Sequence, residues 1–117
     1  MEEILKQLNS SAGAKGSVVV THDGMVVAGD IRWEVEKDVV GALSSFLVMA
    51  TDRCLQQGKM GKLNRMTMIA THGKLIIVSL QGYFLVVLVD QFAAMDQVSP
   101  QIEAAGRELL KLTQMKV

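Results

Sequence analysis

The chain has 117 residues, half of them apolar, which fits a single domain with one modest hydrophobic core. Twelve lysines and arginines balance twelve aspartates and glutamates, so the formal charge is zero. A nucleic-acid-binding domain usually carries a basic excess, so this balance argues against a nucleic-acid partner. The single cysteine excludes an internal disulfide and suits a reducing, cytoplasmic compartment. We expect one domain spanning residues 1–117.

The N-terminal segment is polar and acidic, unlike a signal peptide. Its apolar side chains recur at helical spacing, which predicts a short amphipathic helix over residues 2–12. The longest apolar run, residues 83–89, is too short to span a bilayer, so we expect no insertion into a membrane.

The stretch GSVVVTHDGMVVAG, residues 16–29, places Asp23 and Gly24 between two valine-rich runs. Asp-Gly in this setting indicates a β-hairpin with a type I′ turn, in which both central residues have positive φ. That register pairs Val20 with Val27. Both faces of the hairpin are mainly apolar, so we expect each face to be covered. The stretch therefore predicts a hairpin of a sheet and not a catalytic loop.

Residues 35–57 predict a long helix of roughly 33 Å. Its main apolar stripe comprises Val39, Leu43, Phe46, Leu47, Ala50 and Cys54, and is widened by Val40, Ala42 and Met49. Val48 and Leu55 lie near the opposite side. The stripe places Cys54 in the core. Because a helix that touches only its own sheet needs a narrower stripe, the surplus predicts a second contact.

Three strands at residues 63–71, 75–80 and 83–89 are separated by short turns at His72-Gly73 and Gln81-Gly82, which is typical of an antiparallel meander. The last two strands are apolar on both faces and should be central, whereas the first is more polar and should form an edge. Ser99 and Pro100 then predict the start of the last helix, with serine as the cap and proline at the first helical position. The buried stripe of that helix comprises Ile102, Ala105, Leu109 and Leu112.

No stretch of the chain predicts an active site. The glycine-rich segments at residues 13–17 and 58–62 do not match the phosphate-binding pattern GxxxxGK[ST], and both precede strands. His22, His72 and Cys54 do not form a convincing zinc-binding set. We therefore expect no catalytic, cofactor-binding or metal-binding residues, and no enzyme.

Three segments carry a family resemblance: VVVTHDGMVVAG, VVGALSSFLVMATDRCL and MTMIATHGKLIIVSLQGYFLVVLVD. Together they make nearly the whole chain resemble the Roadblock/dynein light chain family, and most of all its bacterial MglB-type regulators of a Ras-like GTPase. The resemblance implies an α/β fold of the α+β type. It implies a five-stranded antiparallel sheet of order 2-1-5-4-3, with the long middle helix on one face and the terminal helices on the other.

The resemblance also implies a homodimer whose third strands pair edge to edge while the middle helices pack together. This arrangement would cover both the exposed edge strand and the surplus apolar stripe. The dimer-interface residues it implies are Ala42, Phe46, Met49, Arg65, Thr67 and Ile69.

A small Ras-like GTPase is the second partner that the resemblance implies. It would dock on the composite face of the two middle helices, and regulators of this family are thought to act by repositioning the GTPase's own catalytic groups. The GTPase-binding residues it implies are Ser45, Met49, Asp52, Arg53 and Gln56. Binding would accelerate GTP hydrolysis, promote nucleotide exchange or only tether the GTPase.

Other functions are compatible with the same residues. A light-chain-like scaffold for a partner that is not a GTPase is the main alternative, followed by a small-ligand sensor with a cavity between sheet and helix. Arg53 could also reach a partner's nucleotide as an arginine finger, although a solvated or interface arginine is the simpler interpretation.

Overall fold

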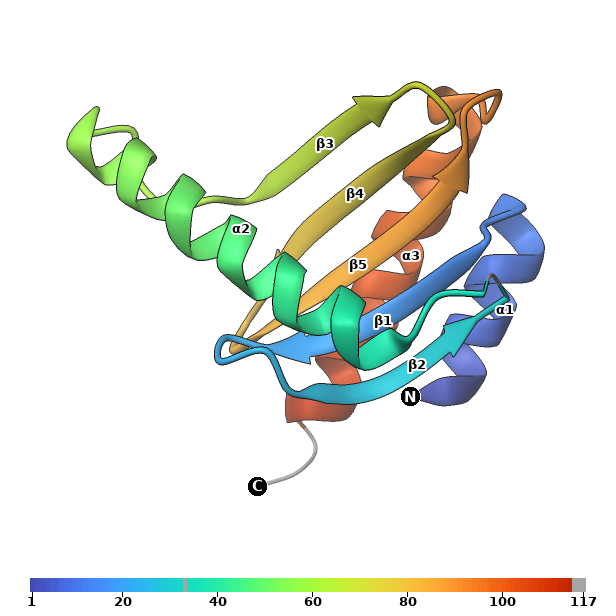
Figure 1. Ribbon diagram of the computed structural model, residues 1–117. Coiled ribbons are helices and arrows are strands. Elements are labelled where there is room, and N and C mark those ends of the chain that lie inside the picture. The colour runs from blue at the N-terminus through green and yellow to red at the C-terminus, as the bar shows by residue number, and fades with distance from the viewer. Residues whose placement is uncertain (33, 115–117) are drawn as a thin grey trace.

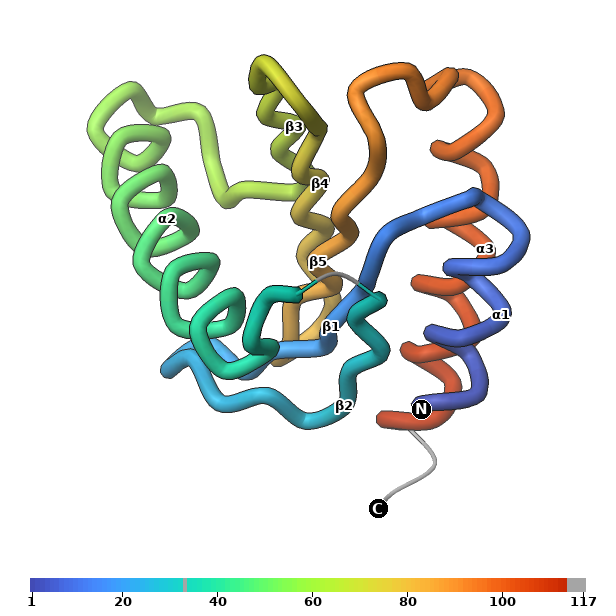
Figure 2. Tube along the Cα trace, turned by 45° about the vertical axis from the view of Figure 1, so that its right-hand side comes forward, coloured from blue at the N-terminus to red at the C-terminus, as the bar shows by residue number. Residues whose placement is uncertain are grey.

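Eight helices and strands follow one another in the computed structural model, which describes residues 1–32 and 34–114. They are α1 (Glu2–Ala12), β1 (Gly16–Thr21), β2 (Val26–Ile31), α2 (Lys37–Gln57), β3 (Arg65–Ala70), β4 (Gly73–Leu80), β5 (Tyr83–Asp90) and α3 (Met95–Gln114). The five strands form one antiparallel sheet in the order β2-β1-β5-β4-β3. Helix α2 lies across one face, and α1 and α3 lie side by side on the other (Figures 1 and 2). The predicted topology and layers are confirmed.

The alternation of side chains along β1 divides the core in two. Val19 points toward α1 and α3, where it packs in the larger cluster with residues such as Leu85. Val18 and Val20 point the other way and pack with Val48 of α2. Because β1, β4 and β5 are apolar on both faces, each face must be covered, as the sequence predicts.

The β1–β2 hairpin forms, but the predicted turn type and part of its register are wrong. The N–H of Gly24 donates to the carbonyl of Thr21 at 3.0 Å, and only Gly24 in this turn has positive φ, at 92°. A type I′ turn would also require positive φ at Asp23. The ladder pairs Val19 with Ala28 but Val20 with Val26, so Val27 is the extra residue of a β-bulge.

Helix α2 buries the face opposite to the predicted stripe. Its buried residues are Val40, Gly41, Ser44, Ser45 and Val48. The small side chains let the helix approach the hairpin closely, and the hydroxyl of Ser45 donates a 2.6 Å hydrogen bond to the carbonyl of His22. The predicted main stripe, Cys54 included, is exposed apart from the half-buried Leu47, so the expected core thiol is wrong. Of the residues expected to widen the stripe, Ala42 and Met49 are exposed, whereas Val40 is buried.

The last helix begins at Met95 and not at Ser99, so Pro100 lies inside it. Val98 is buried in the core, which gives the first turn a packing contact that the Ser-Pro signal does not reveal. Pro100 has no N–H to donate to the carbonyl of Asp96, so the helix lacks one hydrogen bond near its start. The predicted buried stripe is confirmed at Ile102, Ala105 and Leu109, while Leu112 is half-buried.

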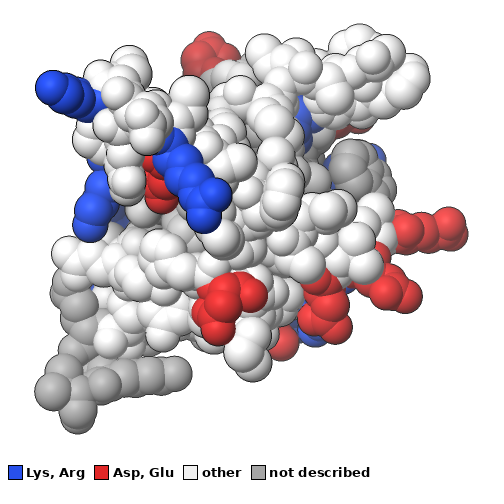
Figure 3. Space-filling view, turned by 60° about the vertical axis from the view of Figure 1, so that its left-hand side comes forward, with Lys and Arg blue, Asp and Glu red and all other residues white. Residues whose placement is uncertain are grey.

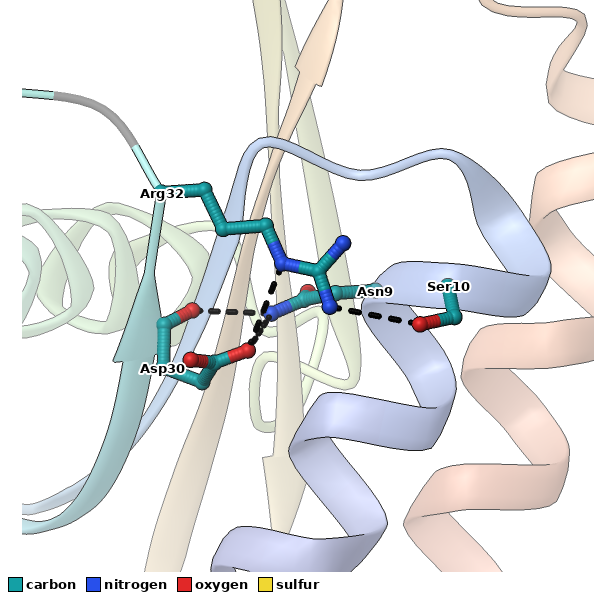
Figure 4. Close-up of polar contacts among 4 residues, drawn as sticks. All are labelled: Asn9, Ser10, Asp30 and Arg32. Carbon is teal, nitrogen blue, oxygen red and sulfur yellow. Dashed lines mark hydrogen bonds and ion pairs between the residues drawn. The ribbon is translucent and has the colours of Figure 1, made fainter.

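A polar contact fastens α1 to the edge strand β2 (Figure 4). The side-chain amide of the buried Asn9 donates to the backbone oxygen of Asp30 at 2.8 Å and to its carboxylate at 2.9 Å. Arg32 lies 3.6 Å from the same carboxylate and donates to the hydroxyl of Ser10. These contacts occupy the side of β2 that faces α1.

Candidate protein–protein interface

The outer face of α2 is an exposed apolar surface. We define it by the side chains of Val39, Ala42, Leu43, Phe46, Met49 and Ala50. Phe46 is 70% exposed, Leu43 61% and Met49 53%. A monomeric protein rarely leaves such a continuous apolar row in water, so this face has the character of a contact surface.

Strand β3 lies beside this face as an open edge of the sheet. All its residues except Met66 are exposed, and Ile69 is 75% exposed. Its pairing with β4 runs without a register shift from Arg65 to Ala70. A regular and uncovered edge presents a row of free backbone groups that can pair with another chain.

The opposite edge, β2, is protected in ways that β3 is not. The bulge at Val27 interrupts its ladder with β1. Both α1 and α2 contact β2, and the Asn9–Asp30 contact holds it from one side. Bulges and flanking elements are common means of blocking edge-to-edge association. The β3 edge is therefore more accessible than the β2 edge for pairing with a further strand.

The six residues expected at a dimer interface lie on these two adjoining surfaces. Ala42, Phe46 and Met49 are exposed on the outer face of α2, and Arg65, Thr67 and Ile69 are exposed on β3. The guanidinium of Arg65 donates to the hydroxyl of Ser99 at 2.7 Å, which places its side chain on the α3 side of the sheet.

The five residues expected to bind a GTPase are only partly brought together. Met49, Arg53 and Gln56 are exposed along one side of the C-terminal half of α2. Ser45 is buried against the hairpin turn, so it is not on this surface. Asp52 is half-buried, and its carboxylate accepts a 2.9 Å hydrogen bond from the N–H of Leu63. That contact gives Asp52 a structural role at the end of the loop that leads to β3.

Charge is distributed unevenly along the same side of the molecule. The start of α2 is mainly acidic, with Glu34, Glu36 and Asp38 exposed beside Lys37, and its end is basic, with Arg53, Lys59 and Lys62 exposed. Figure 3 shows acidic side chains toward the right, basic ones at the upper left and a mostly uncharged area between them. The apolar face of α2 thus separates two ends of opposite charge.

Sequence reasoning missed two features next to these residues. Leu43 is on the outer face of α2, and its i, i+3 spacing to Phe46 is the signal that could have added it to the interface. An open hollow of about 500 Å³ lies at the β3–β4 end of the sheet, lined in part by Met68, Leu75 and Leu88. No periodicity predicts this hollow, because it depends on how far α2 extends over the sheet.

Other kinds of site find little support in the described part of the chain. It contains no group of three or more His, Cys, Asp or Glu side chains that could hold a metal ion. None of its helices combines the length and apolar character needed to cross a membrane.

Comparison with known protein families gives one match that covers most of the chain. The family model described as "Roadblock/LC7 domain" matches residues 1–90. The uncharacterized protein MJ0310 of Methanocaldococcus jannaschii is 36% identical over 90 residues, which are 77% of this chain and 79% of that protein. This relative is archaeal, so the expected bacterial origin stays a prediction.

Solved structures agree in fold over almost the full length. MglB of Myxococcus xanthus superimposes with a TM-score of 0.92 and 17% identity, covering 97% of this chain and 94% of that one. The gliding protein MglB of Thermus thermophilus gives a TM-score of 0.86 and 16% identity, with coverage of 97% and 87%. At this identity the likeness establishes a shared fold.

Proposed function

The chain belongs to the Roadblock/LC7 domain family, and from that premise we propose that it is a non-catalytic homodimeric regulator of a small Ras-like GTPase. It binds the GTPase and modulates its GTP hydrolysis or nucleotide state. The observation that carries the proposal is the outer face of α2, an exposed apolar helix surface beside the uncovered edge strand β3. Another protein can cover an exposed apolar helix face or pair with an open strand edge, and neither feature contains a reactive group.

A second copy of the chain would cover both the outer face of α2 and the edge of β3. Pairing of β3 with its own copy satisfies the free backbone groups of the edge, and a two-fold axis there brings the two α2 outer faces to the same side of the joined sheet. The contact is isologous, so Phe46 and Ala42 of each protomer pack against the same surface of the other. Burial of these side chains supplies the hydrophobic stabilisation of the dimer.

The charge distribution along α2 supports an antiparallel arrangement of the two helices. Such packing places the acidic start of one α2 near the basic end of the other, where the opposite charges attract. Parallel packing would set Glu36 and Asp38 against their own copies. The favoured orientation is the one that a two-fold axis perpendicular to the sheet produces.

The GTPase contacts the C-terminal half of α2 in this proposal. Met49, Arg53 and Gln56 follow one another at i, i+4 and i+7, so they project from one side of the helix. Two copies of this side, one from each protomer, form a composite surface with apolar and basic character. The protein contributes no catalytic group and acts by changing the position of groups that the GTPase already has.

The proposal is tested by titrating the protein with the Ras-like GTPase of the same organism, loaded with GDP or with a non-hydrolysable GTP analogue. We expect calorimetry to show tighter binding to the GTP form. Arg53→Ala should weaken that binding, whereas Arg107→Ala, which removes an exposed arginine on α3, should leave it unchanged.

The outcomes separate the candidate functions. Preference for the GTP form supports a regulator, and the rate of GTP hydrolysis with and without the protein then distinguishes activation from tethering. Equal binding of both forms contradicts regulation and favours a tether. Binding to neither form overturns the proposal in favour of a scaffold for another kind of protein.

A further inference from the structure

The direction of the backbone groups of β3 can be assigned residue by residue. The N–H of Ser79 donates to the carbonyl of Asn64 at 2.8 Å, so these two residues form a hydrogen-bonded pair of the β3–β4 ladder. Hydrogen-bonded and non-hydrogen-bonded pairs alternate in an antiparallel ladder. Met66, Met68 and Ala70 therefore direct their N–H and C=O groups toward β4. Arg65, Thr67 and Ile69 direct theirs out of the open edge.

A two-fold axis through an antiparallel pair of identical strands makes one residue face its own copy. The three residues near the middle of β3 that could do so are Met66, Thr67 and Met68. The residue on the axis determines which backbone groups of the two edges face each other. A stable ladder requires that each residue with its N–H and C=O directed out of the edge faces a residue of the same kind in the partner, over as much of the strand as possible.

Only with Thr67 on the axis does every residue of β3 that directs its backbone groups out of the edge face such a residue within the partner's β3. Thr67 then pairs with the partner's Thr67, and Arg65 pairs with the partner's Ile69. Centring on Met66 would bring Ile69 opposite the partner's Leu63, whose N–H already donates to the carboxylate of Asp52.

Centring on Met68 is also less favourable. It would bring Arg65 opposite the partner's Thr71, which lies in the β3–β4 turn and not in the strand. One of the three outward residues of β3 would then lack a partner in an extended conformation.

We propose that two copies of the chain pair through β3 in a single register, with Thr67 on the two-fold axis. This inference rests on the homodimer of the proposed function and specifies its geometry. On the α3 side of the sheet, the stem of Arg65, held at its guanidinium by Ser99, covers the exposed side chain of the partner's Ile69. On the α2 side, Met66 faces the partner's Met68.

The same symmetry accounts for the hollow beside β3. The C-terminal end of helix α2 extends past the start of β3 (Figure 1), and the hollow lies at the other end of the strand. Leu75 and Leu88, which line it, pack on the α2 side of the sheet. A two-fold axis at Thr67 exchanges the two ends of β3, so it brings the C-terminal end of each α2 to the same end of the joined strands as the partner's hollow. We expect the hollow to border the dimer contact.

Single cysteines placed on the strand test the register directly. The background variant is Cys54→Ser, which removes the exposed native thiol. Thr67→Cys places two thiols on the axis in a hydrogen-bonded pair, about 5.5 Å apart at Cα, a separation that suits a disulfide. Met66→Cys and Met68→Cys are matched controls, because each is self-facing in one of the other two registers. Mild oxidation followed by non-reducing electrophoresis measures crosslinking.

We expect crosslinked dimer as the main product for Thr67→Cys and little for either methionine variant. Faster crosslinking of Met66→Cys or Met68→Cys would overturn the register while leaving the dimer intact. A dimer by light scattering with no crosslinking at any of the three positions would overturn β3 pairing. A monomeric Cys54→Ser protein, with wild type also monomeric, would instead refute the homodimer of the proposed function.

Discussion

A Cβ atom on Gly41 of α2 would lie only 2.8 Å from Cγ2 of Val26 in β2 and 3.2 Å from the carbonyl oxygen of Gly24. Helix and hairpin are therefore in contact through backbone atoms at this point. The close approach fixes which side of α2 faces the sheet, and so which side carries the exposed apolar row.

Replacing Gly41 tests this close approach. We expect Gly41→Ala to lower the free energy of unfolding by about 1 kcal/mol, since overpacking costs about 1–3 kcal/mol and the better helix propensity of alanine offsets roughly 1 kcal/mol. Urea denaturation at a fixed protein concentration measures the change. Gly106→Ala in α3 is the matched control, because its Cβ would meet Leu80 at an ordinary 3.5 Å and should stabilise the protein. Equal stabilisation by both substitutions would contradict the close contact.

Substitutions at Ser45 and Arg53 should affect different properties, the first the stability of the fold and the second the binding of the GTPase. Ser45→Ala removes the hydrogen bond to the carbonyl of His22 and should lower the free energy of unfolding by about 1 kcal/mol without changing affinity for the GTPase. Arg53→Ala should weaken GTPase binding without changing stability, because Arg53 is exposed. Thermal unfolding and calorimetry measure the two effects. A loss of GTPase affinity in a stable Ser45→Ala protein would indicate that Ser45 contributes to GTPase binding.

Asp52 is expected to support the structure through its hydrogen bond to the N–H of Leu63. Asp52→Ala leaves this donor unpaired and should lower the free energy of unfolding by about 1–3 kcal/mol. Asp52→Asn keeps a side-chain oxygen at the same position, so its loss of stability should be smaller. Chemical denaturation of the two variants compares them, and equal losses would indicate that the charge of Asp52 matters more than the hydrogen bond.

Phe46→Asp should separate the protomers without unfolding them. Phe46 is 70% exposed in the single chain, so the substitution removes little intrachain packing. In the dimer it buries an unpaired carboxylate, which typically costs several kcal/mol. We expect a monomer by light scattering with unchanged far-ultraviolet circular dichroism. Gln7→Asp on the exposed side of α1 is the control and should remain dimeric, and a dimeric Phe46→Asp protein would place the interface elsewhere.

Much of the fold follows from local patterns in the sequence. The periodicity of residues 2–12 predicts α1, and the two-residue turns before β4 and β5 predict the meander, with boundaries that differ by a few residues. The greater polarity of the third strand correctly places it at an edge. These elements were predictable because neighbouring residues determine them.

The orientation of α2 was not predictable from its apolar content. The stripe with the larger apolar side chains faces outward, and the side with Gly41, Ser44 and Ser45 faces the sheet. Periodicity identifies apolar positions but does not tell whether a sheet or another chain covers them. The small residues allow an approach that only the three-dimensional contact with Val26 and Gly24 reveals.

Two boundaries were missed for similar reasons. The β1–β2 turn uses a bulge at Val27 where the Asp-Gly pair alone predicts a regular ladder. Helix α3 starts before its Ser-Pro pair because Val98 gains a place in the core. In α3 a tertiary contact outweighs a local signal.

Light scattering of the wild-type protein across a dilution series shows whether the chain forms a dimer in solution. We expect twice the 12.7 kDa mass of the chain at micromolar concentration. A single-chain mass throughout the series would contradict it, because the outer face of α2 and the edge of β3 would then both remain uncovered in the free protein.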